Sequence, residues 1–287
     1  MNYRHSFHAG NFADVFKHAM LARILVYLTR KDAALRYIDT HAGAGRYDLA
    51  GDAAKRSPEW RDGIGRVVKA RPPAEVAALL RPYLDAVGPC DDDGRPASYP
   101  GSPALAQTLL RPQDRIALCE AHPEERAALT AALGRDRRLS IVATDGYIAL
   151  NAYLPPKERR GLVLIDPPFE EPGESARVEA ALAKALTKWP RGTYALWRPI
   201  KAPIEDARVL NAIAALGAAN ILRLELDVGA VEPGAHSPNP LRRAGLLVVN
   251  PPFELIGEAR ALMSWLAQTL KRAPGGGFVC QWLTPPA

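Results

Sequence analysis

Cysteine is scarce in this chain, and long apolar runs are missing from it. The 287 residues include three cysteines, Cys90, Cys119 and Cys280, which are far apart and form no C-x-x-C pair, so neither a disulfide framework nor a metal site is expected. No apolar run approaches the roughly 18 to 20 residues that a membrane helix needs, and the first residues, MNYRHSFHAGN, lack the apolar core of a secretory signal. We therefore expect a soluble, cytoplasmic protein.

A modest surplus of positive charge is present. The chain has 37 Lys and Arg against 31 Asp and Glu, a net charge of +6, which fits an ordinary solvated surface as well as a nucleic-acid partner. The positions of the cations are more informative, because basic residues in loops can converge on one rim of a sheet. Predicted loops or turns contain Arg135, Arg137, Arg138, Lys157, Arg159, Arg160, Arg242 and Arg243.

Short aliphatic runs alternate with longer amphipathic segments, which is typical of an α/β protein with a largely parallel sheet. We predict seven strands, at residues 34–40, 115–120, 140–145, 161–167, 193–199, 221–228 and 245–250. Only a loop joins the last two, so they should pair antiparallel. Helices are expected at 123–134, 175–189 and 204–217, at about 12–29 with Asn11 as N-cap, and after Ser102 as N-cap with Pro103 at the first helical position.

One interval breaks this alternation. Residues 47–97 insert about fifty residues after the first strand, far more than an ordinary connection. EWRDGIGRVVK and PAEVAALLRPYLDAV look helical within it. We therefore predict a main domain from residues 1–46 and 98–287, with 47–97 as a small helical subdomain.

An acid and two glycines, Asp39, Gly43 and Gly45, follow the first predicted strand. As a dinucleotide fingerprint the segment is poor, because Asp48 takes the place of the third glycine and no acid ends a second strand about 20 residues on. The same residues fit a loop that holds another nucleoside cofactor. The structural alternative is a tight turn that needs positive φ.

Acids also end the next two predicted strands. In a doubly wound sheet the ligand lies across the carboxyl ends of neighbouring strands. There, Glu120 can accept both hydroxyls of a ribose, and Asp145 or the amide of Gly146 can recognise an adenine edge. Each acid alone could instead be a helix N-cap. Together with the glycine turn, they favour a cofactor pocket.

The fourth predicted strand ends in Asp166-Pro167-Pro168-Phe169. An exocyclic adenine amine is a poor nucleophile because its lone pair is delocalised. Hydrogen bonds from its N–H groups to the Asp166 carboxylate and the Pro167 carbonyl would localise that lone pair and aim it. The ring of Phe169 could stack on an extruded base. The alternative is a rigid turn after a buried strand.

A similar string, Asn250-Pro251-Pro252-Phe253, follows the seventh predicted strand. Because that strand should run the other way, Asn250 is expected on the opposite edge of the sheet, as a turn into the last helix. The start of the strand should instead lie on the active rim. We therefore hypothesise that Arg242 and Arg243, in the preceding loop, contact phosphates.

With these residues in place, the chain closely resembles the bacterial RlmJ-type methyltransferases, which modify N6 of an adenine in 23S ribosomal RNA. The match rests on YRHSFHAGN (3–11), ADVFKH (13–18), DTHAGAGRY (39–47), YPGSP (99–103), Asp145-Gly146, LIDPPF (164–169) and TYALW (193–197). The resemblance implies a Rossmann-like class I methyltransferase fold with a helical insertion.

The resemblance also implies roles for individual residues. S-adenosylmethionine contacts are implied for His18, His41, Ser102, Glu120, Asp145 and Gly146, beside the glycine turn of Gly43 and Gly45. Asp166 becomes the catalytic acceptor for the target amine, and Tyr3 lies near the substrate. The family usually has tyrosine where this chain has Phe169, so stacking survives but any hydroxyl hydrogen bond is lost.

The sequence thus predicts a monomeric S-adenosylmethionine-dependent enzyme that methylates adenine N6 in protein-poor 23S ribosomal RNA. A DNA adenine methyltransferase stays open, because the same acid, prolines and aromatic ring serve both substrates. So does a nucleic-acid-binding protein that keeps the fold without catalysis.

Overall fold

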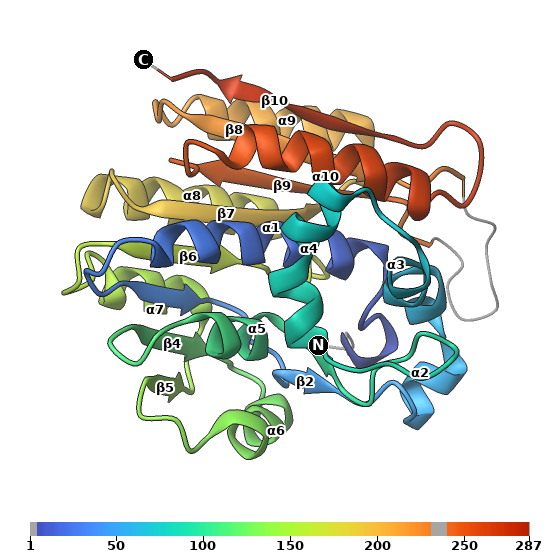
Figure 1. Cartoon of the computed structure of the whole chain (residues 1–287). Coiled ribbons are helices and arrows are strands. Elements are labelled where there is room, and N and C mark those ends of the chain that lie inside the picture. Colours follow the sequence, from blue (N-terminus) through green and yellow to red (C-terminus); the bar gives the residue numbers. More distant parts are fainter. Residues whose placement is uncertain (1–4, 231–239, 287) are drawn as a thin grey trace.

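An eight-stranded sheet forms the centre of the computed structural model, which describes residues 5–230 and 240–286 (Figure 1). The strand order is β10-β8-β9-β7-β6-β1-β4-β5. The strands are β1 (Arg36–Asp39), β4 (Arg115–Cys119), β5 (Leu139–Val142), β6 (Gly161–Ile165), β7 (Thr193–Pro199), β8 (Ile221–Asp227), β9 (Arg243–Val249) and β10 (Gly277–Thr284). A separate short ladder pairs β2 (Arg46–Tyr47) with β3 (Tyr99–Pro100).

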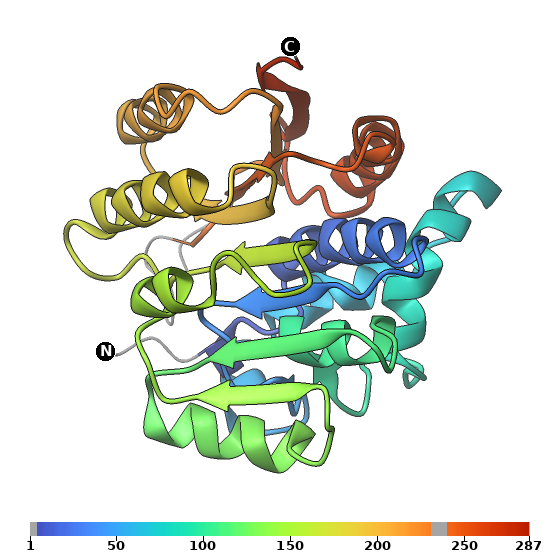
Figure 2. The ribbon, with the colours of Figure 1, turned by 90° about the vertical axis from the view of Figure 1, so that its left-hand side faces the viewer.

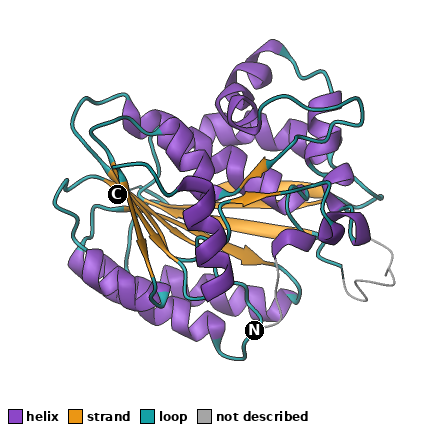
Figure 3. Cartoon of the chain, turned by 90° about the horizontal axis from the view of Figure 1, so that it is seen from below, coloured by secondary structure: helices purple, strands orange, loops and turns teal. Residues whose placement is uncertain are grey.

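Helices cover both faces of this sheet (Figure 3). One face packs against α1 (Phe12–Thr29), α5 (Ser102–Leu109), α6 (Pro123–Leu133) and α10 (Leu255–Thr269). The other packs against α7 (Gly146–Tyr153), α8 (Glu174–Lys188) and α9 (Pro203–Ala214). Successive residues of β1 point to opposite faces, with Tyr37 in the first core and Ile38 in the second. Burial on both faces explains the nearly continuous apolar runs of the central strands.

All seven predicted strands are present, but the prediction of seven was one too few. The eighth, β10, pairs antiparallel with β8 at the edge of the sheet. Its residues, GFVCQWLT, are mostly half-buried, so they show neither the alternation nor the solid apolar run that marks the other strands. The remaining fold prediction, a Rossmann-like, mostly parallel methyltransferase sheet, is confirmed.

Strand direction determines which loops meet. Strand β9 lies between β7 and β8 and is antiparallel to both, as predicted for the last two of the seven strands. Strands β1, β4, β5, β6 and β7 are parallel to one another. Their carboxyl ends therefore meet at one edge of the sheet, together with the beginning of β9 (Figure 2).

Helix α1 begins where the sequence predicted. The side chain of Asn11 accepts hydrogen bonds from the amides of Ala13 (2.9 Å) and Asp14 (3.0 Å). The helix is buried over most of its length, and Lys17, His18 and Arg23 are buried within it. A buried lysine and a buried histidine need polar partners. Lys17 pairs with Asp14 and Asp166, and His18 lies within hydrogen-bond distance of Tyr99.

The prediction that Ser102 caps α5 was wrong. Gly101 is the N-cap, and Ser102 is the first helical residue. The Ser102 hydroxyl instead donates to Oδ2 of Asp39 at 2.7 Å. Serine is common at N-caps, but a buried acid within reach takes its hydroxyl here.

The insertion after β2 contains four helical segments: α2 (Asp52–Arg56), η2 (Glu59–Asp62), α3 (Ile64–Lys69) and α4 (Ala74–Val87). One predicted helix is split at Gly63, where the amide of Ile64 donates to the carbonyl of Gly10 (2.8 Å). Side chains such as Trp60 and Tyr83 belong to the same buried cluster as α1. The division into two domains stays a prediction.

A further finding concerns membranes. Among the described helices, none combines the length and the apolar character that crossing a lipid bilayer requires.

Candidate active site

A cavity of about 540 Å³ opens at the carboxyl edge of the sheet. It lies where the strand order changes direction, because β4 and β5 continue to one side of β1 whereas β6 and β7 continue to the other. Ligands of doubly wound sheets bind at such switch points. The loops after β1, β4, β5 and β6 and the first turns of α1 all contribute to its wall.

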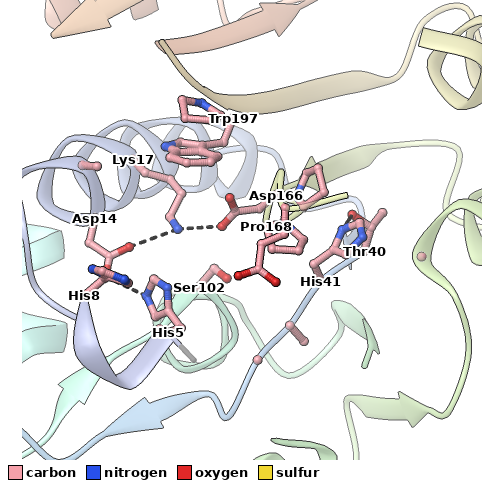
Figure 4. A pocket seen from close by; sticks show the side chains of 18 of the residues that line it. His5, His8, Asp14, Lys17, Thr40, His41, Ser102, Asp166, Pro168 and Trp197 are labelled. Carbon is pink, nitrogen blue, oxygen red and sulfur yellow. Dashed lines mark hydrogen bonds and ion pairs between the residues drawn. The ribbon is translucent and has the colours of Figure 1, made fainter. Parts of the chain in front are cut away.

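Asp166, which directly follows β6, heads a chain of charged groups along one wall (Figure 4). Its Oδ2 lies 2.6 Å from Nζ of Lys17, which in turn lies 3.1 Å from Oδ1 of Asp14. Nε2 of His5 lies 2.9 Å from Oδ2 of Asp14. Two acids thus share one buried ammonium group, and the hydrogen bond from Lys17 goes to Oδ2 of Asp166, not to Oδ1.

The neighbours of Lys17 and Asp14 favour the charged form of each side chain. Burial alone would lower the pKa of Lys17, but the carboxylates of Asp166 and Asp14 outweigh it and hold that pKa above its usual range. Burial alone would raise the pKa of Asp14, but His5 and Lys17 hold it well below its usual range. Sequence reasoning did not single out Lys17. The available signal was its place, with Asp14 one turn earlier, in a helix otherwise too apolar to face water.

The two residues after Asp166 lie beside the cavity, but Phe169 does not line it. Pro167, Pro168 and Trp197 belong to the wall. Phe169 has φ of 52°, and its ring packs 5.9 Å from the ring of Trp197. The role of Phe169 as a stacking surface stays a prediction.

The glycine turn after β1 has the positive φ that its residues suggested. Gly43 (φ 60°) lines the cavity, and its amide donates to Oε2 of Glu120 at 2.8 Å. Gly45 (φ 75°) faces α6 instead, where an added Cβ would lie 2.6 Å from Cδ1 of Leu129. Gly43 is therefore placed for a ligand, whereas Gly45 shapes the turn.

Behind this turn, Asp39 is fully buried and supports the loop from below. Its Oδ2 accepts from the hydroxyls of Tyr37 (2.8 Å) and Ser102 (2.7 Å), and Oδ1 accepts from the amide of His41. Burial raises the pKa of Asp39 to about 6. Ser102 itself lines the cavity, as its predicted cofactor role requires.

Glu120 and Asp145 both line the cavity, but they differ as helix caps. Glu120 caps no helix: Oε1 accepts from the amide of His122 (2.8 Å), and burial raises its pKa. Asp145 does cap α7, through the amides of Tyr147 (2.8 Å) and Ile148 (3.2 Å). For Asp145, the two interpretations of the sequence are therefore both compatible with its position.

Gly146 lets the start of α7 approach the end of β1. A Cβ at this position would lie 2.2 Å from the carbonyl oxygen of Thr40. Real Cβ atoms do not come so close, so a larger residue would push α7 away and open this wall of the cavity. The close contact with Thr40 therefore explains why glycine follows Asp145.

The two predicted cofactor histidines line the cavity and are held by neighbours. Nδ1 of His18 lies 2.9 Å from the hydroxyl of Tyr99, which lies 3.0 Å from the hydroxyl of Tyr83 in the insertion. Burial lowers the pKa of His18 to about 3, so its ring is neutral near pH 7. His41 lies edge-on to Tyr147, with ring centroids 5.3 Å apart, and burial lowers its pKa as well.

The predicted substrate residues fare differently. Tyr3 lies outside the described residues. Arg243 forms an ion pair with buried Glu225, and its predicted phosphate contact stays a prediction. Arg242 is exposed, next to Leu241, which lines the cavity.

The second P-P-F string lies where the sequence placed it, away from the cavity. Nδ2 of Asn250 donates to the carbonyls of Pro190 (2.9 Å) and Gly192 (2.8 Å), which precede β7 at the opposite edge. The ring of Phe253 is 89% exposed. Of the two similar strings, only the one that begins with Asp166 lines the cavity.

Comparisons with known proteins identify the family of this chain. The model of the family described as "Ribosomal RNA large subunit methyltransferase D, RlmJ" matches residues 32–284. Two proteins named ribosomal RNA large subunit methyltransferase J are similar over 99% of both chains: that of Escherichia coli is 38% identical and that of Haemophilus influenzae 36%. A crystal structure of a Legionella pneumophila protein, 32% identical, superposes with a TM-score of 0.84 over 96% of this chain and 98% of that one.

Proposed function

The chain belongs to the RlmJ family of ribosomal RNA large subunit methyltransferases, and from that premise we propose how its cavity works. It is an S-adenosylmethionine-dependent methyltransferase, and its reaction is methylation of an adenine N6 in 23S ribosomal RNA. The observation that carries the assignment to an amine is the position of Asp166. Its carboxylate lies at the switch point with Oδ1 free of Lys17, next to the backbone of Pro167.

The residues of the cavity fit S-adenosylmethionine. Glu120 and Asp145 offer carboxylate oxygens that suit ribose hydroxyls and an adenine amine, and Gly43 lines the cavity beside them. Neutral His18 and the hydroxyl of Ser102, which also line the cavity, offer polar atoms to the other end of the cofactor. When bound, the cofactor supplies an electrophilic methyl group on a sulfonium.

Asp166 and Pro167 orient the amine that receives the methyl group. One N–H donates to Oδ1 of Asp166 and the other to the Pro167 carbonyl, which localises the nitrogen lone pair and directs it at the methyl carbon. Preorganised acceptors of this kind lower the barrier without reorganising during the reaction. As positive charge develops on the nitrogen, the Asp166 carboxylate stabilises it and takes up the departing proton at Oδ1.

Lys17 keeps Asp166 ready for this role. Its ammonium group holds Oδ2 at 2.6 Å, which fixes the orientation of the carboxylate inside a largely buried site. Asp14 and His5 in turn fix Lys17. We propose Lys17 as a positioning residue and Asp166 as the catalytic residue.

Three features of the substrate and its setting are also part of the proposal. Phe169, beside Trp197, would move to stack on the extruded base. A monomer is proposed as the active form. Extrusion of a base is easiest where few proteins cover the RNA, so protein-poor 23S ribosomal RNA in the cytoplasm is the proposed substrate.

Product identification tests the proposal. Purified protein would be incubated with radiolabelled S-adenosylmethionine and, separately, deproteinised 23S ribosomal RNA from an unmodified strain, 16S ribosomal RNA and duplex DNA. We expect label in N6-methyladenosine from 23S ribosomal RNA alone. Label in DNA instead would indicate a DNA adenine methyltransferase, and cofactor binding without any transfer would indicate a binding protein.

A further inference from the structure

The cavity extends past Asp14, away from the wall that holds His41. Figure 4 shows Asp166 between His41 on one side and Asp14 with His8 on the other. Near His8 the wall includes Glu59, 3.0 Å from its Nδ1, together with Lys201 and Arg272, whose charges act on His8 and Glu59 respectively. We infer that this end of the cavity is a subsite for an RNA phosphodiester next to the target adenosine, with Arg272 and Lys201 as its ligands. The inference rests on the proposed function, in that the target is a nucleotide of RNA.

Arg272 is the main reason for the assignment. Its side chain is 14% exposed, and within residues 5–230 and 240–286 its Nε has no hydrogen-bond partner. The carboxylate of Asp62 lies 3.9 Å from that Nε, and the guanidinium lies over the ring of Phe12, 5.7 Å from its centroid. A guanidinium has five N–H donors, and one withdrawn from water is costly unless acceptors meet them. An anion in the cavity would supply those acceptors.

The nearby acid, Glu59, is held by two neighbours. Oε1 of Glu59 lies 3.0 Å from Nδ1 of His8, and Oε2 accepts from Nδ2 of Asn11 at 2.9 Å. Burial would lower the pKa of His8, but Glu59 outweighs it and raises that pKa. Arg272, with the Asp62 carboxylate 3.9 Å from its Nε, and the exposed Lys201 place two cations at this end of the cavity.

The distribution of charge around the cavity disfavours a phosphate at the other end. Among the described residues, the segments that follow β4, β5 and β6 line the cavity, besides Asp166, with six carboxylates, from Glu120, Glu125, Asp145, Glu170, Glu171 and Glu174, against one cation, Arg177. A nucleotide whose base reaches Asp166 has a phosphodiester on each side of its ribose. Because arginine meets phosphate oxygens in a paired, charge-assisted geometry, the phosphodiester that enters the cavity should lie at the Arg272 end.

The test is a double-mutant cycle across the contact. The ligand is a short single-stranded oligouridine with one central adenosine, synthesised with an ordinary backbone or with a neutral methylphosphonate at the linkage 5′ or 3′ to that adenosine. Binding is measured by fluorescence anisotropy with saturating S-adenosylhomocysteine. The proteins are the wild type, Arg272→Gln, Arg272→Lys and Lys201→Gln, with Arg191→Gln and Lys31→Gln as controls, because both residues are exposed at the opposite edge of the sheet.

We expect one of the two neutral linkages to weaken binding to the wild type by about tenfold, the size of one charge-assisted hydrogen bond. Arg272→Gln should weaken binding of the ordinary RNA by a similar factor. This variant should bind the ordinary RNA and the RNA with that neutral linkage with equal affinity. Arg272→Lys should recover part of the loss, and Lys201→Gln should reduce the salt dependence of binding. The two controls should behave like the wild type.

Several results would overturn the inference. The first is an unchanged affinity of Arg272→Gln for the ordinary RNA. The second is that each neutral linkage weakens binding to the wild type and to Arg272→Gln by the same factor. The third is no measurable binding of the RNA by the wild type. Weaker S-adenosylhomocysteine binding in Arg272→Gln would instead assign Arg272 to the cofactor carboxylate, which also overturns it. Thermal unfolding of each variant shows whether it is folded, and the Lys201 variant, altered at an exposed position, provides a second route. Failure of the proposed function would appear separately, as binding of RNA without methyl transfer.

Discussion

Nζ of Lys17 lies 2.6 Å from Oδ2 of Asp166, although the two residues are 149 positions apart in the chain. Helix α1 is buried against the sheet, and this contact joins its first turns to the end of β6. This ion pair therefore joins the packing of α1 to the chemistry of the site.

Replacing Lys17 should damage both activity and stability. In Lys17→Met, two buried carboxylates lose their shared cation, which should cost roughly 3 to 5 kcal/mol of unfolding free energy. Methyl transfer should fall by about 100-fold in the protein that remains folded, because Asp166 loses its fixed orientation. Denaturant unfolding and single-turnover kinetics measure the two effects.

Arg23→Met is the matched control for Lys17→Met. Arg23 is also buried in α1, and it pairs with Glu258 through two hydrogen bonds of 2.9 and 2.6 Å, outside the cavity. It should lose stability and keep its single-turnover rate. An equal loss of rate in both variants would show that α1 acts only through packing.

Tyr99→Phe should weaken cofactor binding, because the Tyr99 hydroxyl fixes the ring of His18 at 2.9 Å. A buried ring nitrogen left without a partner costs about 1 to 3 kcal/mol, so stability should fall as well. Tyr194→Phe is the control, since its hydroxyl donates to the carbonyls of Ala185 and Trp189 away from the cavity. Calorimetry with S-adenosylhomocysteine should show weaker binding only for Tyr99→Phe; equal affinities would mean that the tyrosine is purely structural.

The dependence of stability on pH should report the neutral state of His18. Its pKa is lowered by burial from 6.5 to about 3 in the folded protein, so the unfolded chain binds more protons between these values. Stability from this group is therefore complete above about pH 6.5 and is lost on acidification, by about 1.4 kcal/mol per pH unit within the window. Urea unfolding at several pH values should show a shallower dependence for His18→Gln, whereas parallel curves for the two proteins would contradict the assignment.

Gly45→Ala should destabilise the protein more than Gly173→Ala. Both glycines have positive φ, of 75° and 85°, which costs alanine about 1 to 2 kcal/mol. Only at Gly45 does an added Cβ meet a neighbour, Leu129 at 2.6 Å, whereas nothing lies within 4 Å at Gly173. Overpacking adds about 1 to 3 kcal/mol, measurable by urea unfolding; equal losses would show that α6 moves aside freely.

Local sequence signals were sufficient for most of the fold. Aliphatic runs located the central strands, and Asn11 located the start of α1, because both depend on residues close in the chain. Strand β10 was missed because an edge strand with half-buried residues has no marked pattern. The role of Ser102 was missed because its partner, Asp39, is distant in sequence.

The acids of the site were predictable from their positions in the sequence. Acids at successive strand ends indicated Glu120, Asp145 and Asp166, and all three line the cavity. Lys17 was not singled out, since a lysine in a helix usually faces water, whereas this one is buried by the packing of α1. The ion pair of Arg243 with Glu225 was not predictable, because Glu225 lies on the neighbouring strand.

The most direct test of the account is the single-turnover rate of methyl transfer to deproteinised 23S ribosomal RNA by the wild type and by Asp166→Asn. Asparagine keeps the shape of the side chain but loses the charge that accepts the amine proton, so the rate should fall by about 100- to 1,000-fold with cofactor binding unchanged. A rate within a few fold of the wild type would contradict the assignment of Asp166 as the catalytic acceptor.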